Sequence, residues 1–312
     1  MTVTDYLLHV FYLIDTELET LNRSSWSLSE QPPLRRRGPQ PTVADSEVIT
    51  MELVGEFLGI DTDKGIWRFF RQYHRPEFPN LAHVTRTTFA RQAAALWRVK
   101  QLLHRRVLRW LPLRDPLDQQ RWWIIDSFPI RTCKLARSKR SRLFSGIASY
   151  GRDPALPRNL FFGLRGHLRA SDRGPIAQVE LTAANVADLD AAVALTPGDP
   201  REPCLGDRNY WHRSPQRSCR FAQAAMVLLA PFKQKQTDPD RARSRRLSRL
   251  RQLIEPVIGQ LATRFNIERT WARDLWHLSS RITRKILSHT VAALLNWRAG
   301  NPMLQLDRLI DA

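Results

Sequence analysis

The chain has 312 residues and a formal net charge of +19, because 49 Lys and Arg residues stand against 30 Asp and Glu residues. Such an excess repels itself in a compact protein unless a polyanion offsets it, so it predicts a nucleic-acid partner, with a merely basic solvated surface as the alternative. No run approaches the ~18 consecutive apolar residues of a transmembrane helix, which argues against a membrane protein. Residues 1–15 do not resemble a secretory signal, and three cysteines without metal-binding spacing predict a reduced, cytoplasmic protein without a zinc site.

The first part of the chain, residues 1–115, predicts an all-helical and basic domain. Apolar residues recur at helical spacing in stretches before residue 75 and again over residues 87–111. Around the apolar stripe of this last helix the charged residues are nearly all basic, which favours contact with DNA over a merely solvated surface. They are Arg91, Arg98, Lys100, Arg105, Arg106 and Arg109.

A different pattern predicts a second domain over residues 116–312. The apolar run from Trp122 to Ile125 indicates a strand buried on both faces, with Asp126 at its inner end. Two further strands are joined by a hairpin turn at 172–174, and later strands alternate with helices. An antiparallel meander followed by strands with helical crossovers is the element order of an RNase H-like α/β domain. We therefore expect a mixed sheet with flanking helices, preceded by the all-helical domain.

Asp126 needs an explanation, since burying an ionised carboxylate without a partner raises its pKa or costs several kcal/mol. It either starts a turn or binds a metal ion together with other acids. Two more acids stand at comparable places, Asp207 just after the fourth strand and Glu255 in the helix after the fifth. Three converging carboxylates repel one another without cations, but with two Mg²⁺ or Mn²⁺ ions about 4 Å apart they form a phosphoryl-transfer site.

Six sequence blocks carry a resemblance to a known family. In chain order they are ADSEVITMEL and FPNLAHVTRTTF in the helical region, IIDSFPIRTC around Asp126, LFFGLRGHLRASDRGPIAQVELTAANVADLDA in the central hairpin and the helix after it, LGDRNYW around Asp207 and RQLIEPVIGQL around Glu255. Their order and spacing, through most of the chain, resemble the DDE transposases of the bacterial insertion sequence 982 family, part of the insertion sequence 4-like group.

The resemblance implies both an activity and its site residues. Asp126, Asp207 and Glu255 would be the metal-binding catalytic triad. The protein would bind the terminal inverted repeats of its own element as a homo-oligomer, hydrolyse a phosphodiester and join the resulting 3′-hydroxyl to target DNA. It would act in the bacterial cytoplasm, on the nucleoid, with Mg²⁺ or Mn²⁺ as its cofactor.

The chain also departs from the family's signature. Arg251 keeps the spacing of four residues before Glu255, but the signature's Tyr falls on Ser248 and its Lys on Ala262. These departures leave two other functions open. One is a transposase-derived DNA-binding protein that has lost catalysis, such as a repressor, and the other is a plain metal-dependent nuclease. Pro256 disfavours helical geometry at the residue before it and predicts that the helix kinks or restarts near Glu255.

Several basic residues of the second domain are expected to contact DNA phosphates. His167 either faces the site or is a satisfied core histidine, and Trp211 either stacks on a flipped base or packs beneath the sheet. The expected phosphate contacts are Arg208, Lys233, Lys235, Arg245, Arg246, Arg249 and Arg251.

Overall fold

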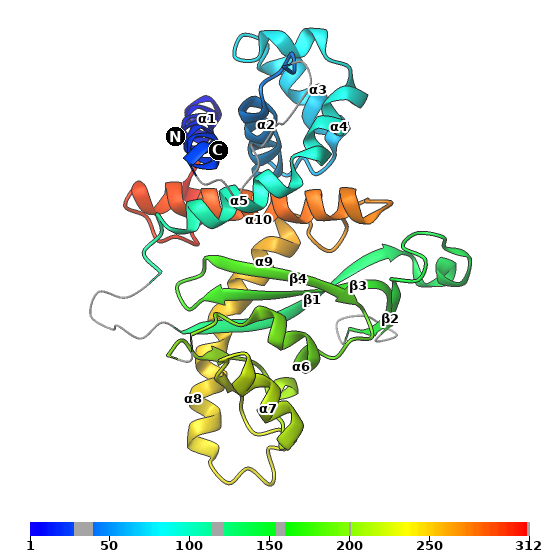
Figure 1. Ribbon diagram of the computed structural model, residues 1–312, viewed down its shortest axis with the longest axis vertical. Helices are drawn as coiled ribbons and strands as arrows, with labels where there is room; N and C mark the ends of the chain where they lie inside the picture. The colour runs from blue at the N-terminus through cyan, green and yellow to red at the C-terminus, as the bar shows by residue number, and fades with distance from the viewer. Residues whose placement is uncertain (28–39, 114–121, 154–159, 200, 311–312) are drawn as a thin grey trace. The chain divides into compact units, whose positions relative to one another are not determined.

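The computed structural model describes residues 1–27, 40–113, 122–153, 160–199 and 201–310 (Figure 1). Contacts divide the chain into two compact units. Unit 1 contains Met1–Trp110 together with Thr263–Ala312, and unit 2 contains Leu111–Ala262. The boundary predicted between residues 115 and 116 lies outside the described residues and stays a prediction. The last fifty residues, which we expected within the second domain, group with the N-terminal helices.

Unit 1 is helical in all its regular elements, as the apolar spacing predicted. Its last long helix packs against α2, α4 and α5, which explains why the C-terminal residues belong to this unit. The helix expected over residues 87–111 is two helices, because the backbone leaves helical geometry at Leu96. None of the helices among the described residues is long and apolar enough to cross a membrane. The helices are α1 (Val3–Ser27), α2 (Asp45–Phe57), α3 (Asp63–Tyr73), α4 (Arg86–Ala95), α5 (Trp97–Leu108) and α10 (Leu275–Arg298).

A network of buried charges joins the helices of unit 1. Lys100 on α5 is fully buried and donates to Glu52 on α2 at 2.7 Å, so its expected contact with DNA is wrong. The guanidinium of Arg284 on α10 contacts Glu56 at 2.5 Å, Glu52 at 3.4 Å and Asp63 at 2.5 Å. Burial opposes the charge of Arg284, but these carboxylates together hold the pKa of its guanidinium above its ordinary value. A buried charge needs such partners, and here each cation has at least one acid.

Unit 2 is built on a mixed sheet. Strand β3 pairs antiparallel with β1 along one edge and with β2 and β4 along the other. Strand β1 pairs in parallel with β5, and β5 pairs in parallel with β6. The hairpin predicted at 172–174 connects β3 to β4. The strands are β1 (Trp123–Cys133), β2 (Ser149–Arg152), β3 (Leu160–Ser171), β4 (Ile176–Ala183), β5 (Cys204–Leu205) and β6 (Leu228–Leu229).

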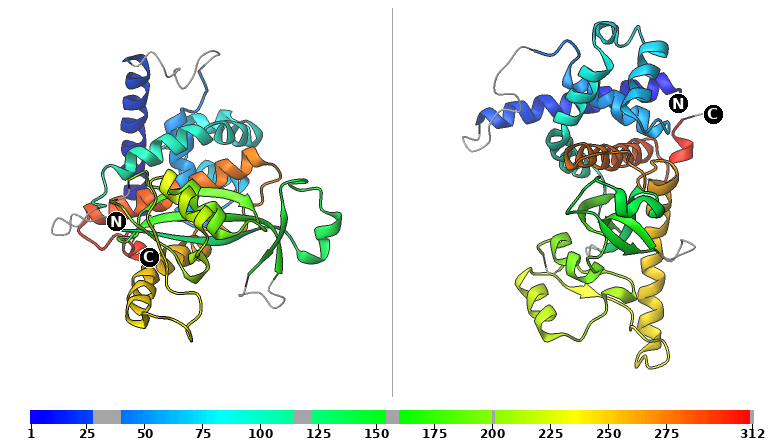
Figure 2. Two further views of the ribbon diagram at one scale, coloured as in Figure 1. Left: turned by 60° about the horizontal axis from the view of Figure 1, so that its bottom comes forward. Right: turned by 90° about the vertical axis from the view of Figure 1, so that its right-hand side faces the viewer.

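Helices cover both faces of this sheet (Figure 2). Neighbouring residues of β1 point to opposite faces, as in any strand. Ile125 is fully buried in a core with Leu189 and Phe221, at helices α6 (Asp188–Ala191) and α7 (Pro215–Gln223). The next residue, Asp126, instead binds a side chain from α8 (Arg241–Arg251). Helix α9 (Glu255–Thr263) continues after the 3₁₀ turn η5 (Gln252–Ile254). The site therefore forms where β1 meets the α8–α9 junction.

Candidate active site

Asp126 lies near the middle of β1 and is held by two donors. Its Oδ1 accepts the backbone N–H of Ser127 at 2.8 Å, and its Oδ2 accepts from Arg251 Nη1 at 2.8 Å. Burial raises the pKa of Asp126 to about 6, and the charge of Asp207 adds to this rise, while the two donors oppose it. The two donors therefore do not fully offset the effect of burial on the ionised form of Asp126. A buried carboxylate with further acids near it favours binding a cation.

Asp207 comes to the same end of the sheet through parallel pairing. Ile124 pairs with Leu205, so Asp126 and Asp207 each lie two residues beyond this pair on adjacent chain segments. Asp207 accepts from the backbone N–H of Asn209 at 2.8 Å and from its side-chain amide at 3.0 Å. Burial raises the pKa of Asp207 against these bonds. The register of β1 and β5 thus explains why two acids 81 positions apart in sequence become neighbours.

Arg251 joins two of the predicted acids. Its Nη1 binds Asp126 and its Nη2 binds Glu255 Oε1 at 2.9 Å. Arg251 ends α8 and Glu255 begins α9, so the restart predicted from Pro256 is confirmed, with Pro256 in the first turn of α9 where proline is tolerated. The Glu255 side chain is 57% exposed, whereas that of Asp126 is 20% exposed. One guanidinium therefore bridges a mostly buried acid and an accessible one.

A fourth acid, Asp188, escaped the sequence reasoning. It is the first residue of α6, and its charge raises the pKa of both Asp126 and Asp207, after the contribution of burial. Arg165 Nη1 lies 3.5 Å from Asp188 Oδ1 and donates to the Ser127 hydroxyl at 3.2 Å. A signal was present, because Asp188 opens a helix directly after strand β4 of the same sheet, but we interpreted that stretch only as a helix.

His167 is a core histidine in this structure. It is fully buried on β3, where its Nε2 shares a hydrogen bond with the Thr182 hydroxyl at 2.8 Å. Its Nδ1 lies 3.6 Å from Asp188 Oδ1. Burial lowers the pKa of His167 to about 4 despite the nearby Asp188 carboxylate, so the ring is neutral near pH 7. Of the two interpretations, the structure favours the structural one.

Trp211, the other aromatic candidate, packs within unit 2. Its ring meets Phe232 edge to face with centroids 4.6 Å apart, and the Arg213 guanidinium lies 5.2 Å from its centroid. Arg208, expected at a phosphate, donates to the Phe232 carbonyl at 2.5 Å. These contacts give both residues a structural role in fixing the segment that follows Asp207.

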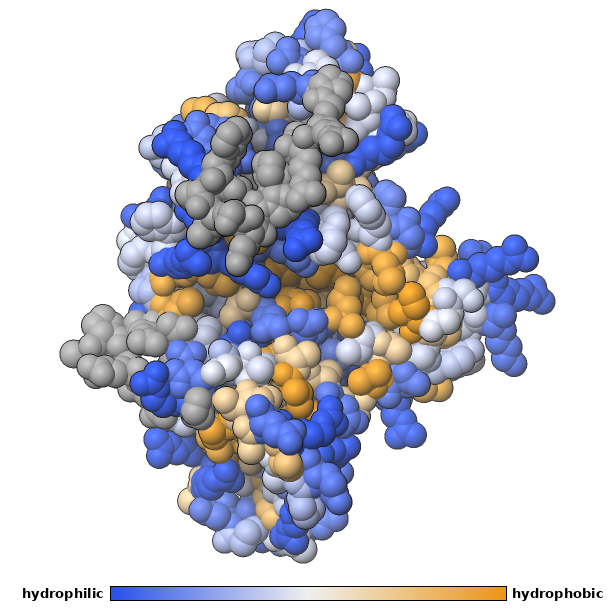
Figure 3. All heavy atoms as spheres, viewed as in Figure 1, coloured by the Kyte–Doolittle hydropathy of each residue, from blue (hydrophilic) through white to orange (hydrophobic). Residues whose placement is uncertain are grey.

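Most of the expected phosphate-binding residues are exposed. Lys233 and Lys235 lie in the loop after β6, and three arginines lie on the open side of α8, whose buried side carries Ser244 and Leu247. A second basic segment, η2 (Leu135–Arg140), was not selected from the sequence. It presents exposed basic residues where Figure 3 shows strongly hydrophilic side chains projecting from the surface. The three exposed arginines of α8 are Arg245, Arg246 and Arg249.

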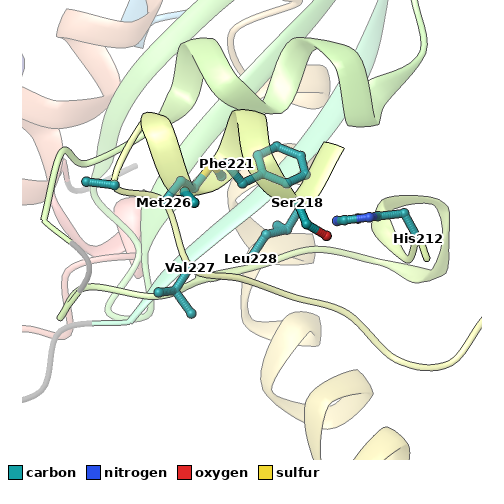
Figure 4. Close-up of a pocket in the computed structure, with 8 residues that line it drawn as sticks. His212, Ser218, Phe221, Met226, Val227 and Leu228 are labelled. Carbon is teal, nitrogen blue, oxygen red and sulfur yellow. The ribbon is translucent and has the colours of Figure 1, made fainter. Parts of the chain in front are cut away.

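A pocket of about 330 Å³ lies beside α7, apart from the acids (Figure 4). The side chains of His212 and Ser218 point toward one another, and the remaining lining is mostly apolar. Neither Asp126, Asp207 nor Glu255 lines it. The sequence did not indicate this pocket, because its walls come from ordinary apolar residues of α7 and the chain leading into β6. The lining residues are His212, Ser218, Phe221, Ala222, Ala225, Met226, Val227 and Leu228.

The side chains of the site suit a hard cation without enclosing one. Among the described residues, no group of three or more His, Cys, Asp or Glu side chains is arranged to hold a metal ion. Asp126 and Asp207 nevertheless offer carboxylate oxygens whose pKa is raised by burial and by neighbouring acids, and oxygen ligands fit the preference of Mg²⁺ and Mn²⁺. Glu255, accessible and held through Arg251, is the third oxygen donor near them.

Comparison with known proteins adds one finding. Residues 118–275, about half of the chain, match the family described as a transposase DDE domain. The matched range includes the six strands and all four acids described above. No curated protein and no solved structure matched the chain.

Proposed function

Because this chain belongs to the family of transposases with a DDE domain, we propose that Asp126, Asp207 and Glu255 are the three acids of its active site. The contact of Arg251 with both Asp126 and Glu255 carries this proposal, because it links residues 129 positions apart. The parallel pairing of β1 with β5 supports the inclusion of Asp207. Membership of the family makes DNA the expected partner.

We also infer that unit 2 is an RNase H-like catalytic domain. In the sheet β4, β3, β1, β5 and β6 follow one another, so β1 lies beside β5. This pairing, with helices on both faces of the sheet, is the arrangement that we expect of that fold. The blocks around the three acids support assignment to the insertion sequence 982 family within the insertion sequence 4-like group. The signature's Tyr and Lys positions, Ser248 and Ala262, distinguish this chain from the usual pattern.

Asp126, Asp207 and Glu255 would hold Mg²⁺ or Mn²⁺, as two ions in the proposed mechanism. When bound, the metal activates the attacking oxygen and stabilises the leaving oxygen of a phosphodiester. The protein itself positions the three carboxylates. Backbone and side-chain donors from Ser127 and Asn209 orient Asp126 and Asp207, and Arg251 orients Glu255. Fixing these oxygens beforehand lowers the reorganisation that the reaction requires.

The proposed reaction is hydrolysis at the ends of an insertion sequence, followed by transfer of the 3′-hydroxyl to target DNA. The protein would bind the terminal inverted repeats as a homo-oligomer, in the bacterial cytoplasm on the nucleoid. The presence of all three acids favours this enzyme over a catalytically inactive repressor. A plain nuclease would use the same acids, so joining of a pre-cleaved end to a second DNA distinguishes transposition from simple cleavage.

The test of this function is metal-dependent cleavage of DNA that carries the element's own end. We expect the wild type to nick this end with Mg²⁺ or Mn²⁺, and Glu255→Gln to lose the nicking while it keeps DNA binding. Gln260→Glu, which adds an acid farther along α9, is the control and should nick the DNA end at the wild-type rate. Tight end binding without cleavage by the wild type under either metal would support the repressor instead.

DNA binding is expected to weaken steeply with salt. Arg245, Arg246 and Arg249 are exposed together on α8, so contacts with several phosphates release several counterions. A plot of log Kd against log salt should then have a slope of about 0.9 for each phosphate neutralised. Replacing Arg245 and Arg246 by Gln should lower this slope. A slope near zero in the wild type would contradict an electrostatic interface.

Gly206→Ala is expected to disturb the active site locally. A Cβ at Gly206 would overlap the ring of Tyr210, which is buried in the core, so the segment carrying Asp207 must move. A displacement of about 1 Å lowers a reaction rate about 10²-fold, and we expect a loss of this size in cleavage. Gly259→Ala on α9 is the matched control, because a Cβ there meets no atom within 4 Å. Equal cleavage by the two variants would show that Asp207 does not depend on this close approach.

A further inference from the structure

Two exposed tryptophans stand at the start of α10 in unit 1. Trp271, in the loop before the helix, is 65% exposed, and Trp276, in its first turn, is 54% exposed. Burying a tryptophan contributes more than burying almost any other side chain, so leaving two of them in water at one place is costly. This loop is drawn in orange in Figure 1.

The backbone holds Trp271 outward in a strained conformation. Trp271 has φ of 54°, in the left-handed region that bulky residues rarely adopt. Its neighbours Thr270 and Ala272 are both buried, so the exposed indole is fixed between two anchored residues. Arg281 donates to the Thr270 carbonyl at 2.7 Å and to Asp63 at 2.7 Å. Strain of this kind persists only where the surroundings enforce it, and it is typical of functional positions.

Further bonds from the buried charge network anchor the start of the loop. Lys285 donates to the Phe265 carbonyl at 2.6 Å, and the Asn266 side chain donates to Asp61 at 2.7 Å. Asn266 also has a positive φ, 46°. Two turns of α10 and the start of α3 thus hold the loop from within. The conformation of Trp271 is set before any partner arrives.

The charges around the two indoles indicate what they bind. Arg269 and Arg273 are exposed on the same loop, and Lys64 is exposed beside Asp63. The acid between the two tryptophans, Asp274, is engaged as the cap of α10, where it accepts from the backbone N–H of His277 at 2.8 Å. Indole rings bordered by cations suit a nucleic acid, because bases stack on the rings while cations contact phosphates. An apolar protein partner would not favour these charges. The loop therefore matches DNA better than it matches a second copy of this chain.

We propose that Trp271 is a stacking platform for an unpaired nucleobase of DNA, with Arg269 and Arg273 contacting the adjoining phosphates. The inference rests on the proposed function for its partner, DNA, and adds a second contact site in unit 1, apart from the three acids. Trp276, exposed in the first turn of α10, adds a second aromatic ring to the same segment. Stacking of this kind favours unpaired bases, so the loop recognises a gap or an opened strand end more strongly than an intact duplex.

The experiment uses the full chain without metal and two DNA probes of mixed sequence, an intact duplex and the same duplex with a short single-stranded gap that carries a fluorescent base analogue. Trp271→Ala is expected to weaken binding of the gapped probe about 10-fold and to abolish quenching of the analogue, with a smaller effect on the intact probe. Trp271→Phe should retain part of the quenching. Tyr12→Ala on α1, which removes a 75% exposed aromatic ring, is the matched control and should change neither.

If Trp271 only stabilises the fold, its replacement should lower the melting temperature. Under the stacking role, Trp271→Asn should keep the melting temperature at or above that of the wild type, because Asn tolerates positive φ, while it loses quenching. Unchanged gapped-probe binding by Trp271→Ala and Trp271→Asn, with the wild type still binding DNA, overturns this inference and leaves the proposed function intact. If these variants dissociate an oligomer of this chain but keep DNA binding, Trp271 contacts a second copy of the chain instead of DNA, which also overturns the inference. If the wild type binds no DNA at all, both the stacking inference and the proposed function are wrong.

Discussion

Asp126→Asn is expected to lower metal-dependent cleavage of DNA by about three orders of magnitude, since the lost metal ligand stabilises the transition state by several kcal/mol. Asn matches the shape of Asp, and its single carbonyl oxygen can keep one of the two accepted bonds, from Ser127 or from Arg251. DNA binding without metal should therefore persist. The measurement is single-turnover nicking at saturating protein, beside an equilibrium binding titration. Cleavage retained at the wild-type rate would remove Asp126 from the active site.

The same variant has a second, metal-free consequence. Burial raises the pKa of Asp126 from 3.8 to about 6 in the folded protein, so the folded state takes up a proton more readily than the unfolded state. Stability from this group is present below about pH 4 and is lost as pH rises to about 6, by about 2–3 kcal/mol at most. In a chelator, the wild type should lose stability across this window relative to Asp126→Asn. Parallel stability curves for the two proteins would contradict the raised pKa.

Arg284→Met is expected to destabilise the protein by about 3–5 kcal/mol, because Glu52, Glu56 and Asp63 lose the cation that they share and keep only one each. Arg284 loses contacts with Glu52, Glu56 and Asp63 at once, and burial already raises the pKa of Glu52 above its ordinary value. Met keeps much of the side-chain volume, so the effect reports charge and not a cavity. Urea unfolding followed by circular dichroism measures it.

Two further variants give this prediction its control. Arg298→Met removes an exposed arginine from the same helix and should cost less than about 1 kcal/mol. Adding Glu56→Gln to Arg284→Met removes the carboxylate that buried Lys285 still binds and should lower the stability further. Similar unfolding midpoints for Arg284→Met and Arg298→Met would show that the buried network does not stabilise unit 1.

The sequence predicted those features that rest on local patterns. The apolar run before Asp126 located β1, and the turn at 172–174 located the β3–β4 hairpin. Pro256 indicated the helix restart at Glu255, because the effect of proline on its own helix is local. The pairing of β1 with β5, which brings Asp207 toward Asp126, was expected only through the fold class. Asp188 was missed because its importance comes from tertiary proximity and not from any pattern around it.

The buried charges of unit 1 show where such reasoning fails. Lys100 stands among arginines on a helix, so periodicity and charge alone predict an exposed face. Its burial depends on Glu52, 48 positions earlier, and on Ser280, 180 positions later. The packing partners of α10 were not predicted either, because an apolar stripe does not specify which helices cover it. Long-range pairing of this kind is set by the whole chain.

The division of unit 1 between the two ends of the sequence also affects how the protein is made. On the ribosome, α2 emerges early with Glu56, whose two cations, Arg284 and Lys285, are both on α10. They are synthesised only after all of unit 2. A nascent chain without α10 leaves Glu56 beside apolar helices without these cations, which costs several kcal/mol if the helices close. The helical unit is thus completed only once α10 has been translated, and a premature stop before α10 yields a chain that has every proposed catalytic acid but no finished helical unit.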